Sequence, residues 1–143
     1  MREPVVGAMY HISREIYREL APYLAPAHRV HVLRACEATV ERLVNDRHYF
    51  ARPSRHLFAE IRWRFPLRAQ RRAFAVIDRH LQATRAYLES SNEAMVELTG
   101  TAPTCRATTR RSGLCSHTPD PRTGYCRWHT HLVEEDQRVE LAA

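Results

Sequence analysis

Lysine is missing from this chain altogether, since all 22 basic residues among its 143 are arginine. Coding by a GC-rich genome would produce this bias, because GC-rich codons specify arginine. Whatever its origin, the bias has a physical consequence: guanidinium groups offer planar, bidentate donors that suit phosphate and carboxylate groups. With 16 acidic residues, the formal net charge is +6 and the isoelectric point is about 9.6, so we expect a basic surface.

Long apolar runs are missing as well. No stretch approaches the roughly 20 apolar residues that a membrane-spanning helix needs. The first ten residues carry charges and a proline, unlike the apolar segment of a secretory signal. We therefore expect a cytoplasmic protein with no membrane segment. Thiols stay reduced in that compartment, so the four cysteines favour metal binding over disulfides.

Catalytic signatures are lacking too. The chain has no glycine-rich phosphate loop, no nucleophile elbow and no HExxH motif. His28 and His31 have the spacing of a helical metal pair, but no acidic or thiol partner lies near them in the sequence. Asp78 and His80 are two residues apart on a predicted helix and so face different directions. We therefore expect no enzymatic activity.

Glycine is scarce, and none of the four glycines falls between Gly7 and Gly100. This stretch is rich in helix formers, and its apolar residues recur at helical spacing. We expect four or five helices, at about 13–20, 26–46, from 54 onward, 67–88 and a short last one to 98. Each would have one apolar stripe, so the helices must pack together. The predicted fold is all-α, with a helical bundle over residues 1–98.

The predicted fourth helix has the clearest pattern. Leu67, Phe74, Leu81 and Leu88 recur every seven residues, with Ile77 and Thr84 between them, and we expect these residues to form one continuous apolar seam. The seam would face the core of the bundle.

Other residues of the helical part allow local predictions. Ser90 and Glu93 have capping-box spacing, which predicts the start of a fifth helix, although the fourth helix could instead continue through them. Trp63 and Phe65, at a helix junction, are expected in the core, although either could instead stack on a nucleic-acid base. Cys36 lies on an apolar helix face, where a small buried thiol is the expected role.

The other three cysteines cluster near a histidine in the pattern C-x9-C-x10-C-x2-H, formed by Cys105, Cys115, Cys126 and His129. Three thiolates and one imidazole predict a closed, structural zinc (Zn²⁺) site. The segment needs the metal, because its only large apolar residues are Leu114, Tyr125 and Trp128. The predicted zinc finger covers residues 99–131, and an acidic helical tail follows at 132–143.

Two glycines and two more histidines bear on this site. Gly113 and Gly124 each precede a ligand cysteine by two residues and would permit the sharp turns that present it. His131 and His117 are alternatives to His129 as the fourth ligand. His131 would lengthen the last ligand spacing, and we expect His117 to be a solvated loop residue.

The finger segment resembles two known finger types. Its spacing is similar to the Cys3His finger of plant WRC domains. It also resembles a short finger of bacterial and phage proteins, C-x-A-x-T-x-x-G-x-x-C followed by Y-C-x-x-H. The matching residues are Cys105, Ala107, Thr109, Gly113, Cys115, Tyr125, Cys126 and His129, with one extra residue between the threonine and the glycine. The resemblance covers about 25 residues and implies zinc binding, and WRC domains are associated with DNA binding.

Charge is distributed unevenly along the chain. Between Arg47 and Arg85, ten arginines face two acidic residues, which gives a net charge of +8. Residues 99–131 have a net charge of +4 and residues 132–143 a net charge of −3. This pattern predicts a nucleic-acid-binding protein. Its role could be regulatory, or accessory to the functions of a phage or mobile element. The candidate phosphate contacts are Arg68, Arg71 and Arg72 on the bundle and Arg106, Arg110, Arg111 and Arg127 on the finger.

A second hypothesis remains open. The bundle could bind a protein partner or associate with itself, while zinc only holds the finger together. The acidic tail favours this alternative, because it could dock on a basic face of the protein or on a partner.

Overall fold

A computed structural model describes residues 5–111 and 113–142 of the chain. The outermost residues of the predicted bundle and tail, and Ser112 of the finger, lie outside that description. The described parts hold six α-helices and one two-stranded sheet, which confirms the predicted all-α fold. The chain forms two compact units that divide between Ala86 and Tyr87. The predicted boundaries at residues 98 and 131 stay predictions, and we describe each unit by itself.

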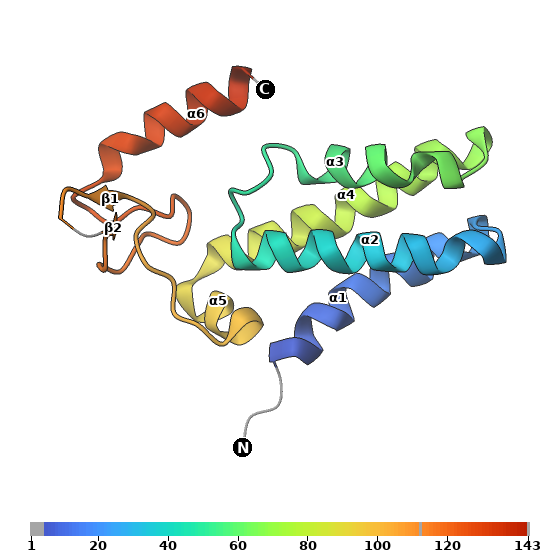
Figure 1. The fold of residues 1–143 in the computed structure, drawn as a ribbon, viewed down its shortest axis with the longest axis horizontal. Helices are drawn as coiled ribbons and strands as arrows, with labels where there is room; N and C mark the ends of the chain where they lie inside the picture. The colour runs from blue at the N-terminus through green and yellow to red at the C-terminus, as the bar shows by residue number, and fades with distance from the viewer. Residues whose placement is uncertain (1–4, 112, 143) are drawn as a thin grey trace. The chain divides into compact units, whose positions relative to one another are not determined.

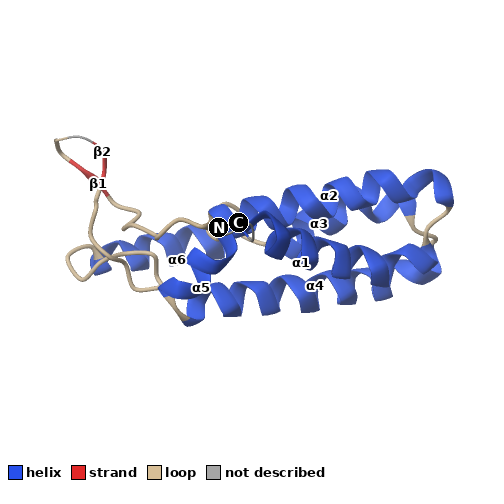
Figure 2. Cartoon of the chain, turned by 90° about the horizontal axis from the view of Figure 1, so that it is seen from below, coloured by secondary structure: helices blue, strands red, loops and turns tan. Residues whose placement is uncertain are grey.

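The first unit is a bundle of antiparallel helices joined by two short turns and by a longer loop over residues 46–52 (Figures 1 and 2). Pro26 and Pro53 stand at the start of their helices, where a missing N–H costs little. The elements are α1 (Val5–Leu20), η1 (Ala21–Tyr23), α2 (Pro26–Asn45), α3 (Pro53–Ile61), η2 (Arg62–Arg64) and α4 (Leu67–Ser90). The part of α4 up to Ala86 belongs to this unit.

Helix α1 begins well before the residue that the sequence indicated. It starts at Val5 rather than near Ser13, so Gly7 lies inside the helix and not ahead of it. A glycine inside a helix costs about 1 kcal/mol relative to alanine. Tertiary packing of a helix face readily outweighs that cost, because most helical stability in proteins comes from packing.

The core of the first unit is mainly aliphatic, although Phe50, Phe65 and polar residues such as Thr39 are also buried. A polar link joins α4 to α1, where His80 Nε2 lies 3.1 Å from Glu19 Oε1. An aromatic contact joins α3 to α4, where Phe58 packs edge-on against Phe74. The most deeply buried residues are Ile16, Leu20, Val32, Cys36, Val40, Leu43, Val44, Leu57, Ile61, Ile77 and Leu81. Cys36 is thus the buried thiol that we expected, and burial raises its pKa to about 12.

The expected seven-residue seam on α4 is only half correct. Leu81 and Leu88 are buried, but Phe74 is half-buried and Leu67 is 85% exposed. An α-helix has 3.6 residues per turn, so positions seven apart drift by about 20° per repeat and leave the core over three repeats. Ile77 and Thr84, the other two residues of the expected seam, are buried. Before Ile77 the buried face follows the helical period through Ala69 and Ala73 instead of Leu67 and Phe74.

The turn before α4 separates two aromatic residues that we expected to be buried together. Phe65 is buried, as predicted, but Trp63 is 74% exposed, so that prediction was wrong. Trp63 lies in the 3-10 turn η2 and Phe65 directly follows it, and the two side chains have different environments. The alternation of basic and aromatic residues includes both Trp63 and Phe65, so it could not show which of them is exposed.

The second unit contains the end of α4, a short helix, a small hairpin and a last helix. Its elements are α5 (Asn92–Thr99), β1 (Thr108–Thr109), β2 (Gly113–Leu114), η3 (Thr130–Leu132) and α6 (Val133–Ala142). The strands are antiparallel, with Thr108 opposite Leu114 and Thr109 opposite Gly113. Among the helices described in either unit, none combines the length and apolar character needed to cross a membrane.

The break between α4 and α5 lies where we expected it, but its cap is the next serine. Ser91 is the N-cap of α5, and its Oγ accepts a hydrogen bond from the backbone N–H of Ala94. Ser90 is the last residue of α4 and donates its hydroxyl to the carbonyl of Tyr87. At the other end, Gly100 closes α5 in the left-handed conformation, with φ of 73°.

Candidate metal centre

The backbone of the finger is arranged by a few hydrogen bonds across its loops. Cys115 N–H donates to the carbonyl of Ala107, at 2.7 Å, beside the β1–β2 hairpin. Cys105 N–H donates to the carbonyl of His117 at 2.9 Å. These bonds bring the first two cysteines together, although nine residues separate them in the sequence.

Two glycines allow the turns that aim the ligands. Gly113 and Gly124 have φ of 99° and 79°, in the region that residues with a Cβ rarely adopt. Each stands two residues before a cysteine, Cys115 or Cys126. The predicted role of these glycines is therefore confirmed.

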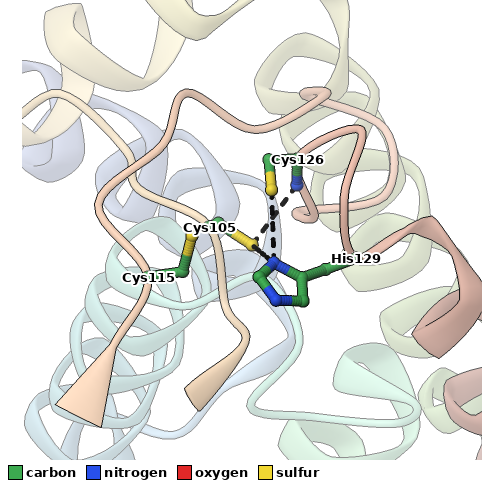
Figure 3. Close-up of side chains that lie close together, drawn as sticks. All are labelled: Cys105, Cys115, Cys126 and His129. Carbon is green, nitrogen blue, oxygen red and sulfur yellow. Dashed lines mark hydrogen bonds between the residues drawn. The ribbon is translucent and has the colours of Figure 1, made fainter. Parts of the chain in front are cut away.

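Four ligand side chains converge at this place. The ligand atoms of Cys105, Cys115, Cys126 and His129 all lie within 4.8 Å of one another. Figure 3 shows the sulfurs of Cys105 and Cys126 facing one edge of the His129 ring. His129 Nδ1 is 3.5 Å from Cys105 Sγ and 3.2 Å from Cys126 Sγ. The group could hold a metal ion, as we predicted, and Nδ1 is the ring atom that faces the site.

The thiol groups differ in how easily they ionise. Burial would raise the pKa of Cys105, but backbone N–H groups of Cys126 and Ala107 donate to its sulfur, and its pKa is lowered overall. Cys115 has a raised pKa: a backbone hydrogen bond from His117 lowers it, but burial and the nearby sulfurs of Cys126 and Cys105 outweigh that bond. Neighbouring thiolates repel one another, which opposes their ionisation. A bound cation would offset this repulsion and favour the thiolate form of all three cysteines.

The interior of the finger consists mainly of the ligand cysteines. Its buried cluster contains Cys105, Ala107, Cys115, Tyr125 and Cys126. Of the three large apolar residues in the segment, only Tyr125 is buried, while Leu114 is 66% and Trp128 is 62% exposed. The apolar contribution to the finger is therefore even smaller than its composition suggests.

Helices on both sides of the finger are attached to it. Asn92 Nδ2, at the start of α5, donates to the carbonyl of Pro119 at 3.1 Å. On the other side, Leu132 and Val133 pack against the buried cysteine cluster. His129 is followed at once by η3 and α6, so the last ligand and the last helix form one continuous segment. The sequence pattern did not indicate this packing, because two apolar residues in an acidic tail show no periodicity.

The two alternative histidine ligands lie outside the group of four. His117 is exposed, as expected, and its Nδ1 lies 3.2 Å from Cys115 Sγ. His131 is also exposed, and its ring centroid is 6.2 Å from that of His129. The structure therefore favours His129 over His131 and His117.

The seven candidate arginines divide between the two units. On α4, Arg68, Arg71 and Arg72 are exposed, and Arg72 Nη1 donates to the hydroxyl of Tyr23 at 3.2 Å. On the finger, Arg106 is half-buried, with its guanidinium 5.2 Å from the centre of the Tyr125 ring. The exposed arginines of the finger are Arg110, Arg111 and Arg127.

Known proteins add no further constraint on the site. No protein-family model matches the chain, and no curated protein or solved structure is significantly similar to it.

Proposed function

We propose that the Cys3His group binds zinc and that the metal folds the finger. The observation that supports zinc is the donor set and its spacing. A tetrahedral zinc with Zn–S of about 2.3 Å and Zn–N of about 2.0 Å would separate sulfur from nitrogen by about 3.5 Å. The sulfurs of Cys105 and Cys126 lie 3.5 and 3.2 Å from His129 Nδ1. Three cysteines and a histidine leave no open position for water, so the role we propose is structural.

Metal analysis of histidine variants tests this proposal. His129→Ala should lower the zinc content well below one per chain, because it removes one of four ligands. His131→Ala is the matched control, since this exposed histidine lies two residues away and should leave zinc bound. Zinc content that falls with His131→Ala and not with His129→Ala would refute the assigned ligand set. Absence of zinc from freshly reduced protein would also refute the proposal.

We propose further that the protein binds nucleic acid through its arginine surfaces. The supporting observation is that exposed arginines occur on both units. None of Arg68, Arg71, Arg110 and Arg111 has an ion pair with a described carboxylate. Guanidinium groups left in solvent in this way are suited to bind phosphate. Such binding is consistent with a regulatory or accessory role and requires no catalysis.

Salt dependence provides the test of nucleic-acid binding. Affinity should fall steeply between about 50 and 200 mM salt, because each phosphate contact releases counterions. The triple variant with Arg68, Arg71 and Arg72 changed to Gln should reduce the slope of log K against log salt by about 2 to 3. The control changes Arg14, Arg29 and Arg34 to Gln, which removes the same charge from exposed positions outside the basic stretch. The proposal fails if neither DNA nor RNA binds at low salt.

The finger type is consistent with this proposal. Its spacing resembles that of WRC domains, which are associated with DNA binding, but the Trp-Arg pair expected before the second cysteine is Gly113–Leu114 here. The resemblance therefore adds more to the zinc proposal than to the DNA proposal.

A protein-interaction module is the second candidate function. The acidic character of α6 favours it, because residues 132–143 carry a net charge of −3 and the rest of the chain is basic. In that case the mass should rise with protein concentration, or a protein partner should bind with affinity that changes little with salt. A steep salt slope toward nucleic acid with a constant monomer mass would favour the first candidate.

A further inference from the structure

Both tryptophans of this protein are exposed, and each carries an arginine on its ring. Trp63 is 74% and Trp128 is 62% exposed. The guanidinium carbon of Arg62 lies 4.3 Å from the Trp63 ring centre, and that of Arg127 lies 4.6 Å from the Trp128 ring centre. In each pair the arginine directly precedes the tryptophan in the sequence. The same arrangement thus occurs once in each unit.

The exposure of Trp63 belongs to an ordered turn. Phe65 is buried and donates its backbone N–H to the carbonyl of Arg62 at 3.1 Å. Gln70 Nε2 donates to the carbonyls of Arg62 and Phe65, at 3.1 and 3.4 Å. These contacts fix the backbone on both sides of Trp63, while its ring stays in solvent. An exposed indole combines a large apolar ring face with an N–H donor, which suits it to recognition.

Trp128 is held in a different way, by the metal site itself. Arg127 and Trp128 are the two residues between the ligands Cys126 and His129. The backbone N–H of His129 donates to the carbonyl of Cys126 at 3.0 Å and closes the turn that carries the pair. A bound metal would fix both ends of this turn, so the ring would be presented without being buried.

Each pair offers two chemical groups side by side. The indole has a flat apolar face on which a nucleobase can stack, and the guanidinium can pair with a phosphate of the same strand. In a duplex, the base faces are covered by neighbouring base pairs and cannot stack on a protein ring. An apolar protein partner would leave the arginines beside the rings desolvated and unpaired. Single-stranded nucleic acid satisfies both groups.

We propose that the pairs Arg62–Trp63 and Arg127–Trp128 are base-stacking sites for single-stranded nucleic acid. This inference rests on the proposed nucleic-acid binding and specifies its ligand. Each stacked base should strengthen binding to a single strand, whereas the exposed arginines elsewhere attract any phosphate backbone.

The two rings can be observed separately, since they are the only tryptophans in the chain. Trp63→Phe leaves Trp128 as the single reporter, and Trp128→Phe leaves Trp63. Each variant is titrated with an oligothymidylate of about 20 nucleotides, longer than most single stacking modules cover. The matched duplex is titrated in parallel. We expect quenching of both native rings by the single strand and no quenching by the duplex.

Affinity measurements with a labelled oligothymidylate complete the test. Trp63→Ala and Trp128→Ala should each weaken single-strand binding by about 5- to 150-fold, the range observed for loss of one stacked base. Duplex binding should be unchanged. The control is Tyr10→Ala, which removes an exposed aromatic ring from α1 and should have no effect. Zinc content shows whether the finger of Trp128→Ala is intact. If it is not, the fluorescence quenching of the Trp63→Phe variant reports on base stacking at Trp128.

The outcomes separate this inference from the function on which it rests. Salt-dependent binding with equal affinity for single strand and duplex, and no quenching, would overturn the inference and leave nucleic-acid binding standing. Quenching of one tryptophan alone would overturn the assignment of the other. Failure to bind any DNA or RNA at low salt would remove both proposals.

Discussion

The bundle and the finger differ in what fills their interiors. In the first unit, residues such as Ile16, Leu43 and Leu81 are fully buried and come from helices far apart in the sequence. In the finger, three of the five buried cluster residues are cysteines, and two of its three large apolar side chains are exposed. The first unit can gain its stability from removing apolar surface from water. The finger has much less such surface, and a metal bound by its cysteines, as we propose, would supply the missing stability.

This difference means that each unit should respond to a different perturbation. Removal of metal should affect only the finger, and a cavity in the aliphatic core should affect only the bundle. The predictions below test whether the two units are independent in this sense, in order of decreasing expected effect.

The largest effect should come from loss of a metal ligand. Cys126→Ser, or chelation of the bound metal, should unfold residues 105–129, because zinc binding contributes on the order of 10 kcal/mol to folding such a segment. Peptides from α2 should keep their protection in hydrogen–deuterium exchange. Cys36→Ala is the control, since this thiol lies in the bundle and should not change the metal content. Protection of the finger in zinc-free protein would contradict the prediction.

A core truncation in the bundle should have the next largest effect. Leu81→Ala should lower the free energy of unfolding of the bundle by about 2 to 5 kcal/mol, because it leaves a cavity at a fully buried position. Leu67→Ala removes the same group from an exposed position on α4 and should change stability by less than about 0.5 kcal/mol. Urea unfolding followed by helical circular dichroism measures both, with zinc content as a check. Equal losses of unfolding free energy in the two variants would indicate that Leu67 belongs to the core, as the seven-residue seam predicted.

Loss of the α5 cap should have a smaller effect, confined to the second unit. Ser91→Ala removes the acceptor for the backbone N–H of Ala94 and should cost about 1 kcal/mol. Ser90→Ala is its control, because that hydroxyl donates only within the last turn of α4. Exchange of the α5 amides is the direct measurement. A larger effect from Ser90→Ala would place the cap where the sequence first indicated it.

The smallest effect should be a pH dependence of the bundle. A hydrogen bond from His80, opposed by burial and supported by the charge of Arg79, lowers the pKa of Glu19 below its ordinary value of 4.5. The stability that Glu19 contributes is therefore present above about pH 4.5 and is lost as the pH falls through the lowered pKa. The loss should be small, because solvent screens the carboxylate of Glu19 and the guanidinium of Arg79, whose side chains are 40% and 64% exposed.

Glu19→Gln tests that dependence. The variant should show a weaker change of the urea midpoint between pH 5 and the acid transition than the original protein. Glu41→Gln, on an exposed part of α2, should leave the dependence unchanged. An identical pH profile for Glu19→Gln and the original protein would show that the link between α1 and α4 has no energetic weight.

Sequence reasoning predicted the features that depend on local pattern. The ligand set was readable because Cys126 and His129 have a short fixed spacing and the surrounding segment has almost no apolar core. The positions of Gly113 and Gly124 followed from the need for turns before the cysteines. The start of α2 at Pro26 followed from backbone chemistry alone.

The features that the sequence did not reveal depend on tertiary packing. Whether Trp63 or Phe65 enters the core is decided by which way a 3-10 turn faces, and both residues are equally apolar. Leu67 fits a seven-residue repeat but lies where the helical period has turned away from the core. Leu132 and Val133 show no pattern of their own, because their partners are cysteines distant in the sequence.

One consequence of the packing of Leu132 and Val133 concerns the turnover of the protein. These residues anchor η3 and the start of α6 to the cysteine cluster, directly after the ligand His129. If the finger holds zinc as we propose, withdrawal of the metal would release that anchor and leave the segment after the finger as an unprotected peptide of the kind that proteases engage. The lifetime of the chain in a cell should then vary with zinc supply, so that metal scarcity shortens it without any change in the bundle.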